Sequence, residues 1–255
     1  WYAISTPMGN EINNTYYNNL ISSNPADYDL FYYNETKWYW YNFKVDANDF
    51  KHFRLGQAYL YANSNNNTIV SVGMPNMNPV SVSVSNTEYT PNDNTQKNYN
   101  LRGFNLIGNP FTFDIGWDAI SSNNILADGY YTLGTDGTWA AKTSNSEPIK
   151  VGMGILVQAK TSGTININDT PFIQTKQIEQ DSKRGISVNE SLSITVANEK
   201  YNDVAHINFG NDSEKGLRKI AHMNDDIQMV YVPVNGVNYA IANVDENASE
   251  VPVSF

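Results

Sequence analysis

The sequence contains no cysteine, little charge and no long hydrophobic run. The absence of cysteine excludes disulfides, thiolate metal ligands and thiol catalysis. Only 16% of the 255 residues are charged and the formal net charge is −10, so the clustered lysine and arginine that bind phosphate are missing. No apolar run approaches the roughly 20 residues of a membrane-spanning helix. We therefore expect no nucleic-acid partner and no membrane span.

The motifs of common enzyme classes are also missing. There is no G-x-S-x-G elbow, P-loop or dinucleotide fingerprint, and His52, His206 and His222 have no metal-binding spacing. Residues 92–94 and 225–226 offer carboxylate or amide oxygens to calcium, but a site needs six to eight ligands and no EF-hand spacing supports one. We expect solvated loop acids there, structural roles for the histidines and no cofactor. Two carboxylates far apart in sequence could still form a glycosidase site.

The polarity of the chain comes from asparagine, serine and threonine, which favour turns and local backbone hydrogen bonds. Aromatic residues make up 13% of the sequence, with 17 tyrosines, and aromatic side chains are enriched in strands. Short alternating segments such as Val80, Val82 and Val84 between serines are typical of strands buried on one face. The composition therefore predicts an all-β protein.

Two stretches of the chain look like copies of one another. Each has an apolar strand ending at a proline, an aromatic hairpin with a tryptophan, and a strand after a glycine. The matching segments are 1–8 and 103–111, 28–43 and 129–143, and 55–63 and 151–159. The shared order and spacing indicate an ancient duplication, so both copies should have the same strand order. We expect Trp38 and Trp139 to fill equivalent core positions, and Gly56 and Gly152 to mark a bulge or a close backbone approach.

The chain divides into two β units in this interpretation. The first is a duplicated β-sandwich or barrel-like unit, and the second is a partial immunoglobulin-like β-sandwich containing an Asn235-Gly236 hairpin. The expected boundaries are 1–178 for the duplicated unit, with copies at about 1–85 and 104–178, then 179–185 for a linker and 186–255 for the partial sandwich. We interpret the sequence as a trimmed mature segment with a truncated end. Val251 to Phe255 should then be covered by a neighbouring chain or be poorly ordered.

The segment Gly103-Phe104-Asn105-Leu106-Ile107-Gly108-Asn109-Pro110-Phe111 resembles a motif in a broad group of surface or secreted proteins of the Bacteroidetes. The following G-Y-Y-T-L…W hairpin and the G-M-G-I-L-V-Q-A strand at 152–159 are similar to the same group. The tail at 205–210 and 230–240 looks like the region before a type IX secretion sorting domain. The resemblance implies an extracellular or cell-surface location and a β-rich fold, and it brings no catalytic residues.

The two copies differ in one surface. With Trp38 aligned to Trp139, the first copy has Phe31, Tyr33, Tyr39 and Tyr41 where the second has smaller or polar residues. Because strand side chains alternate between faces, these four should share the outer face of a hairpin. One interpretation is that this face packs under segment 9–27 or against another domain. The other is a ligand platform, because tyrosine offers a flat apolar ring and a hydroxyl group.

The preferred function at this point is a non-enzymatic extracellular or cell-surface binding module acting in adhesion, with a glycan or a host or surface protein as partner. The alternative is a carbohydrate-binding module attached to a catalytic region elsewhere, and a glycoside hydrolase comes third. Convergent carboxylates in a pocket would favour the hydrolase. An exposed flat aromatic patch would favour the carbohydrate-binding module.

Overall fold

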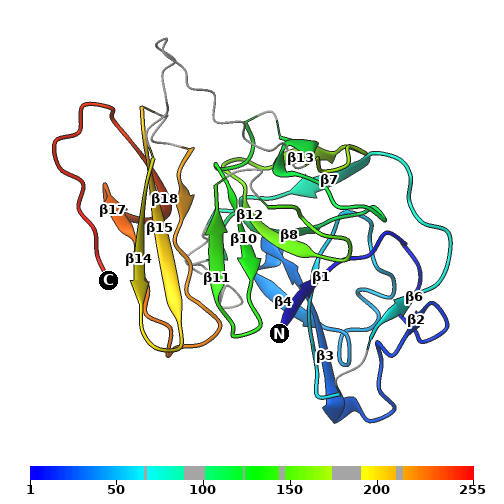
Figure 1. Ribbon diagram of the computed structural model, residues 1–255. Helices are drawn as coiled ribbons and strands as arrows, with labels where there is room; N and C mark the ends of the chain where they lie inside the picture. Colours follow the sequence, from blue (N-terminus) through cyan, green and yellow to red (C-terminus); the bar gives the residue numbers. More distant parts are fainter. Residues whose placement is uncertain (66–67, 89–100, 123, 144–146, 174–190, 211–214) are drawn as a thin grey trace.

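The computed structural model describes residues 1–65, 68–88, 101–122, 124–143, 147–173, 191–210 and 215–255. Over these residues the protein is all-β, and its helical segments are single 3-10 turns. The strands form open sheets, none of which closes into a barrel in the described part of the chain (Figure 1). The expected linker at 179–185 and the calcium candidate at 92–94 lie outside the described residues.

Each repeat forms a four-stranded antiparallel sheet, and the two sheets have the same strand order. The first sheet has the order β1-β5-β3-β4 and consists of β1 (Tyr2–Ile4), β5 (Tyr59–Asn63), β3 (Tyr28–Asn34) and β4 (Tyr39–Asn42). The second has the order β8-β12-β10-β11 and consists of β8 (Phe104–Gly108), β12 (Gly154–Gln158), β10 (Tyr130–Leu133) and β11 (Trp139–Lys142). This is the shared order that the internal repeat predicts.

The two sheets meet at equivalent backbone hydrogen bonds. The N–H of Ser5, after β1, donates to the carbonyl of Gly152 at 2.9 Å, and the N–H of Gly108, at the end of β8, donates to the carbonyl of Gly56 at 2.9 Å. Gly56 and Gly152 have φ values of 76° and 75°, which glycine adopts without the steric cost that a Cβ brings. The close backbone approach expected at both glycines is therefore confirmed, and it joins the repeats.

The strand register corrects the expected match of the tryptophans. Phe31 in β3 pairs with Leu60 of β5, and Tyr131 in β10 pairs with the corresponding Leu156 of β12, so Tyr131 matches Phe31. In the two hairpins Tyr33 pairs with Trp40 and Leu133 pairs with Trp139. Trp40, not Trp38, is therefore the residue equivalent to Trp139. Trp38 is buried, but it caps the 3-10 turn η2 (Glu35–Lys37) with φ of 50°, outside any strand. A register shift of one residue moves every side chain of a strand to the other face of the sheet, and this decides which aromatic side chains share a face.

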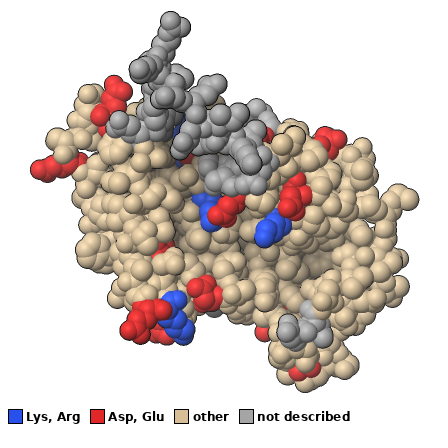
Figure 2. Space-filling model, in the orientation of Figure 1, with Lys and Arg blue, Asp and Glu red and all other residues tan. Residues whose placement is uncertain are grey.

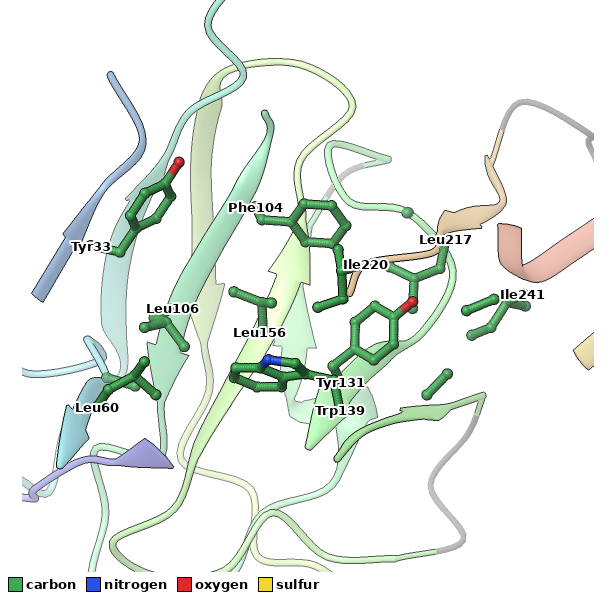
Figure 3. Packing of buried hydrophobic residues seen from close by; sticks show 14 residues of the cluster. Tyr33, Leu60, Phe104, Leu106, Tyr131, Trp139, Leu156, Leu217, Ile220 and Ile241 are labelled. Carbon is green, nitrogen blue, oxygen red and sulfur yellow. The ribbon is translucent and has the colours of Figure 1, made fainter. Parts of the chain in front are cut away.

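The inner faces of both sheets share one hydrophobic cluster (Figure 3). Tyr33 and Leu60 come from the first sheet, and Phe104, Tyr131 and Trp139 come from the second. Side chains of the C-terminal unit complete the cluster, namely Leu217, Ile220, Ala240 and Ile241. The two repeats and the C-terminal unit therefore bury a common core, whose apolar area is the main stabilising contribution.

Further layers cover the outer faces of the two sheets. The first sheet is covered by segment 9–27, which includes β2 (Tyr17–Asn18) paired with β6 (Val70–Ser71) and the 3-10 turn η1 (Pro25–Asp27). The second is covered by the sheet β7-β13-β9 and by the turn η4 (Trp117–Ala119). The strands of that sheet are β7 (Val80–Val84), β13 (Gly163–Ile167) and β9 (Ile120–Ser121). Both faces of each repeat sheet are thus packed against protein.

The C-terminal unit is a single open sheet with the order β14-β15-β18-β16, and β17 also pairs with β18. Its strands are β14 (Ser191–Ala197), β15 (Asn202–Phe209), β16 (Leu217–Arg218), β17 (Val232–Val234) and β18 (Val237–Val244). The β17–β18 hairpin turns at Asn235 and Gly236, with φ of 49° and 77°, as the sequence predicts. The last segment pairs with its own chain, where Tyr231 and Ser254 exchange two hydrogen bonds of 2.9 Å. This single bridge leaves Phe255 87% exposed, so the expectation that a neighbouring chain covers Val251 to Phe255 stays a prediction.

Candidate binding cavity

The four aromatic residues expected to share one face are divided between two faces of the first sheet. Tyr41 pairs with Tyr32 and Tyr39 pairs with Asn34, so both lie on the opposite face from Phe31 and Tyr33. The single outer platform is therefore wrong, because the alignment on Trp38 shifted the register. Tyr39 is 46% exposed, whereas Tyr33 is 4% exposed within the central cluster.

Tyr39 and Tyr41 belong to the aromatic packing on the outer face. The ring of Tyr41 stacks on Tyr32 with centroids 6.0 Å apart, and Tyr39 meets Tyr41 edge-on at 4.9 Å. Tyr41 is half-buried against the cluster that segment 9–27 completes. This pair therefore fits the packing interpretation, and only the outer ring, Tyr39, is open to solvent.

Phe31 and Tyr33 instead line a cavity between the two repeats and the C-terminal unit. Its volume is about 460 Å³. Six aromatic side chains line it, namely Trp1, Phe31, Tyr33, Trp40, Phe104 and Trp139, together with Leu60, Leu101, Leu156, Ala221, His222 and Met223. We call it the aromatic cavity. None of these described lining residues is Asp, Glu, Lys or Arg, so the surface of the cavity is mainly apolar.

Ring contacts fix the aromatic wall that the first sheet contributes. Trp1 lies 5.8 Å from Phe31 and Tyr33 lies 4.7 Å from Trp40, with tilted planes in both pairs. The hydroxyl of Tyr33 is buried and has no hydrogen-bond partner within the described residues. Burial raises the pKa of Tyr33 above its ordinary value, and the nearby Glu35 carboxylate adds to this, so the group stays neutral. Tilted ring pairs of this kind hold their geometry by complementary quadrupoles.

His222 and Tyr33 are the ionisable side chains of the described lining, and protein groups face both ring nitrogens of His222. Nδ1 accepts a hydrogen bond from the N–H of Trp139 at 3.1 Å, and Nε2 faces Oδ1 of Asp203 at 3.5 Å. Asp203 also pairs with Lys219 and accepts the N–H of Val230 at 2.8 Å. Burial raises the pKa of Asp203, but interactions with His222 and Lys219 outweigh it and lower the pKa overall. The imidazole is thus a positioning group for the cavity wall and is not directed at the cavity as a base.

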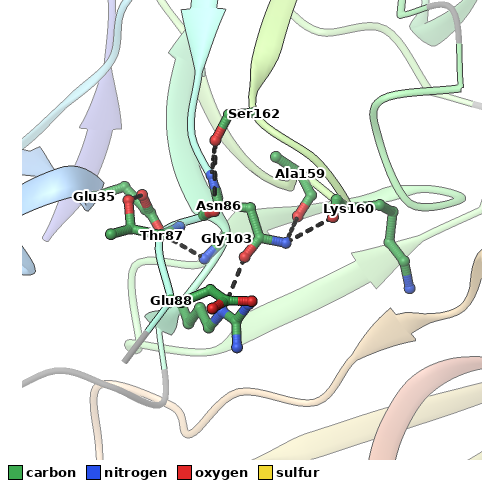
Figure 4. Close-up of polar contacts among 9 residues, drawn as sticks. Glu35, Asn86, Thr87, Glu88, Gly103, Ala159, Lys160 and Ser162 are labelled. Carbon is green, nitrogen blue, oxygen red and sulfur yellow. Dashed lines mark hydrogen bonds and ion pairs between the residues drawn. The ribbon is translucent and has the colours of Figure 1, made fainter. Parts of the chain in front are cut away.

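The buried carboxylate of Glu35 holds the turn between β3 and β4 in place (Figure 4). Glu35, which is 4% exposed, accepts the N–H of Thr87 at 2.8 Å, the hydroxyl of Thr87 at 2.7 Å and the N–H of Gly103 at 2.9 Å. Asn86 beside it donates to the carbonyls of Ala159 and Lys160. These bonds attach the β3–β4 turn to the start of the second repeat, and so hold the two walls of the cavity together.

Charge and metal ligands are sparse elsewhere. Within the described residues no group of three or more His, Asp or Glu side chains could hold a metal ion, and Asp225 and Asp226 lie exposed in a turn. No helix in the described part of the chain is long and apolar enough to cross a membrane. Figure 2 shows one face of the molecule, on which Lys, Arg, Asp and Glu are scattered among uncharged residues.

The sequence predicts Phe31 and Tyr33 on an outer platform, whereas the structure places them in the lining of the cavity, and the sequence does not predict Trp1, Trp40 and Trp139 there. Trp40 shares the face of Phe31 and Tyr33 only through the register across the hairpin, and no local pattern in the sequence indicates that register. Comparisons of the chain with protein-family models, with curated proteins and with solved structures found no match. Function is therefore argued from the site itself.

Proposed function

We propose that this chain is a non-enzymatic binding module of an extracellular or cell-surface protein, and that the aromatic cavity is its main binding site. The observation that carries the proposal is an aromatic cavity of about 460 Å³ at the junction of three packed units. Ligand sites commonly have volumes of roughly 300–1,000 Å³ and a mainly apolar lining with few polar groups. A cavity inside a core of this kind would otherwise cost stability, because its lining loses dispersion contacts.

The chemistry of the lining favours an uncharged, apolar group as the occupant. Six aromatic rings offer a large contact area, no described lining residue is a carboxylate, and the nitrogens of His222 face Trp139 and Asp203. An apolar ring or chain presented by a partner molecule would fill this space and gain about 25 cal/mol for each Å² of apolar surface removed from water. An adhesion module would use such an insertion as its anchor.

The extracellular location rests on the resemblance of segment 103–111 to Bacteroidetes surface proteins and on the asparagine-rich, weakly charged composition. A carbohydrate-binding module is the second candidate, and the exposed ring of Tyr39 favours it. A glycoside hydrolase has less support. Such an enzyme needs two carboxyl groups facing one substrate, and the aromatic cavity has none among its described lining residues.

The proposal is tested by filling the cavity from its rim. Ala221 is an exposed lining residue, so Ala221→Trp would place an indole in the cavity without removing a core side chain. The matched control is Ala26→Trp in η1, which is also exposed and lies outside the lining. The probe is free indole, and its binding is measured by saturation-transfer NMR.

We expect the unmodified protein and Ala26→Trp to bind indole, and Ala221→Trp to bind it at least about tenfold more weakly. Thermal unfolding checks that both variants are folded. If the unmodified protein does not bind indole, or if Ala221→Trp binds it as well as Ala26→Trp does, the aromatic cavity is not the binding site.

A further inference from the structure

A second hollow lies along the junction of the two repeats and differs in chemistry from the aromatic cavity. Its volume is about 420 Å³, and its lining combines hydroxyl and amide side chains with a few apolar ones. The residues that matter here are Asn34, Arg54, Gln57, Ser81 and Ser83, with Leu55 beside them. We call this the polar cleft.

The alternation of β7 explains how serines come to line the cleft. Ser81 and Ser83 share one face of β7, while Val82 and Val84 pack on the core beneath the second sheet, and Val82 also lines the cleft. β7 is also an edge strand of its sheet, paired only with β13 in the described structure. Asn105 fixes this edge, because its amide exchanges hydrogen bonds of 3.0 and 2.9 Å with the backbone of Ser85. The cleft therefore has a rigid polar floor.

Several polar groups of the cleft have no partner in the described protein. The amide of Gln57 and the hydroxyl of Ser83 make no side-chain hydrogen bond there. The guanidinium of Arg54 lies over the ring of Tyr32, 6.0 Å from its centroid, and makes no ion pair in the described residues. These three side chains come from two separate segments and border one hollow. They offer both donors and acceptors to a ligand, as hydroxyl and amide groups do.

The charge of the cleft favours a neutral ligand. Arg54 is its single cation among the described lining residues, and the single carboxylate, Glu35, already accepts three hydrogen bonds from the protein. The net charge of −10 also disfavours anions. Leu55 and Val82 supply apolar surface beside the polar groups. A molecule that has many hydroxyl groups together with apolar C–H faces matches this combination.

We propose that the polar cleft binds a neutral sugar ring. Gln57 and Ser83 hydrogen-bond its hydroxyl groups, Arg54 donates to its oxygens, and Leu55 packs against its C–H face. The described linings of the cleft and the aromatic cavity share only Tyr33, so the cleft can be tested whether or not that cavity binds a ligand.

The probes are free glucose, galactose, mannose, xylose and N-acetylglucosamine, and glucuronic acid is the anionic comparison. Binding of each sugar is measured by saturation-transfer NMR. The test variant is the double substitution Gln57→Leu and Ser83→Val. The matched control is Thr164→Val, because Thr164 is the ladder partner of Ser83 on the neighbouring strand and does not line the cleft. Thermal unfolding checks that each variant is folded.

At least one neutral sugar should bind to the unmodified protein. The double variant should weaken that binding about tenfold, because each hydrogen bond contributes a factor of roughly two to ten, and Thr164→Val should change it less than twofold. The proposal is overturned if none of the neutral sugars binds, if only glucuronic acid binds, or if Thr164→Val weakens binding as much as the double variant. Loss of sugar binding in Ala221→Trp, with the double variant unaffected, would assign the sugar to the aromatic cavity instead.

Discussion

Glu35 provides the sharpest test of how the two repeats are held together. Its carboxylate accepts hydrogen bonds of 2.7, 2.8 and 2.9 Å from Thr87 and Gly103, and its side chain is buried. Hydrogen bonds to a charged group contribute about 1.5–3 kcal/mol each, and a buried donor left without a partner costs about 1–3 kcal/mol. Glu35→Ala leaves the N–H groups of Thr87 and Gly103 without an acceptor. We expect a loss of about 3–5 kcal/mol in the free energy of unfolding.

Thermal unfolding measures this loss directly. For a chain of this size, each kcal/mol lowers the Tm by about 2–4 °C, so Glu35→Ala should lower it by roughly 6–20 °C. Glu35→Gln keeps an acceptor but removes the charge, and its loss should be about half as large. The control is Glu147→Ala, whose carboxylate forms an exposed ion pair with Lys142 at 2.9 Å and should cost less than about 1 kcal/mol. A Tm for Glu35→Ala within about 2 °C of that control would refute the reasoning.

Three further predictions concern stability. Asp203→Asn leaves the buried Lys219 ammonium without its counter-charge and should cost about 3–5 kcal/mol in thermal unfolding, whereas Asp226→Asn at an exposed turn should cost almost nothing. Burial lowers the pKa of His206 below 6.5, so the folded state binds fewer protons than the unfolded state on acidification. The contribution of neutral His206 to the free energy of unfolding is therefore complete above about pH 6.5 and is lost as the pH falls toward the folded pKa. The free energy of unfolding of His206→Gln, measured in urea, should depend less on pH over that range than that of the unmodified protein. Gly56→Ala has the left-handed backbone cost of about 1–2 kcal/mol and also brings a Cβ within 2.5 Å of Val82. Gly236→Ala has the backbone cost alone, so the Tm of Gly236→Ala should fall less than that of Gly56→Ala.

The sequence predicts that the two repeats share one strand order, because the repeated segments keep the same succession of motifs and the same glycines. It also predicts the turn at Asn235 and Gly236, where both positions need a positive φ. Both predictions depend on local chemistry that a single sequence contains.

The register of the first hairpin could not be predicted in the same way. Two tryptophans, Trp38 and Trp40, stand close together, and the choice between them depends on Leu60 and Leu156, which pair with the neighbouring strands. The left-handed conformation of Trp38 is uncommon for a bulky residue, so no propensity indicates that the turn includes it. Alignment on Trp38 therefore assigns Phe31 and Tyr33 to the wrong face of the sheet and gives no indication of the aromatic cavity.

The cavity itself depends on tertiary packing. Its lining comes from both repeats and from the segment 221–223 of the C-terminal unit, so no local pattern in the sequence places these side chains together. The polar cleft is similar, because Gln57 and Ser83 line it from different segments of the chain.

The five tryptophans of the chain allow a direct measurement of whether the aromatic cavity binds a ligand. Trp1, Trp40 and Trp139 line the cavity, whereas Trp38 and Trp117 do not and serve as internal references. The measurement is the fluorine NMR spectrum of protein labelled with 5-fluorotryptophan, recorded while free indole is added. We predict that the resonances of Trp1, Trp40 and Trp139 shift in a saturable manner with one common Kd, while those of Trp38 and Trp117 stay in place. Equal shifts of all five resonances, or no shift of the three cavity tryptophans, would contradict the account.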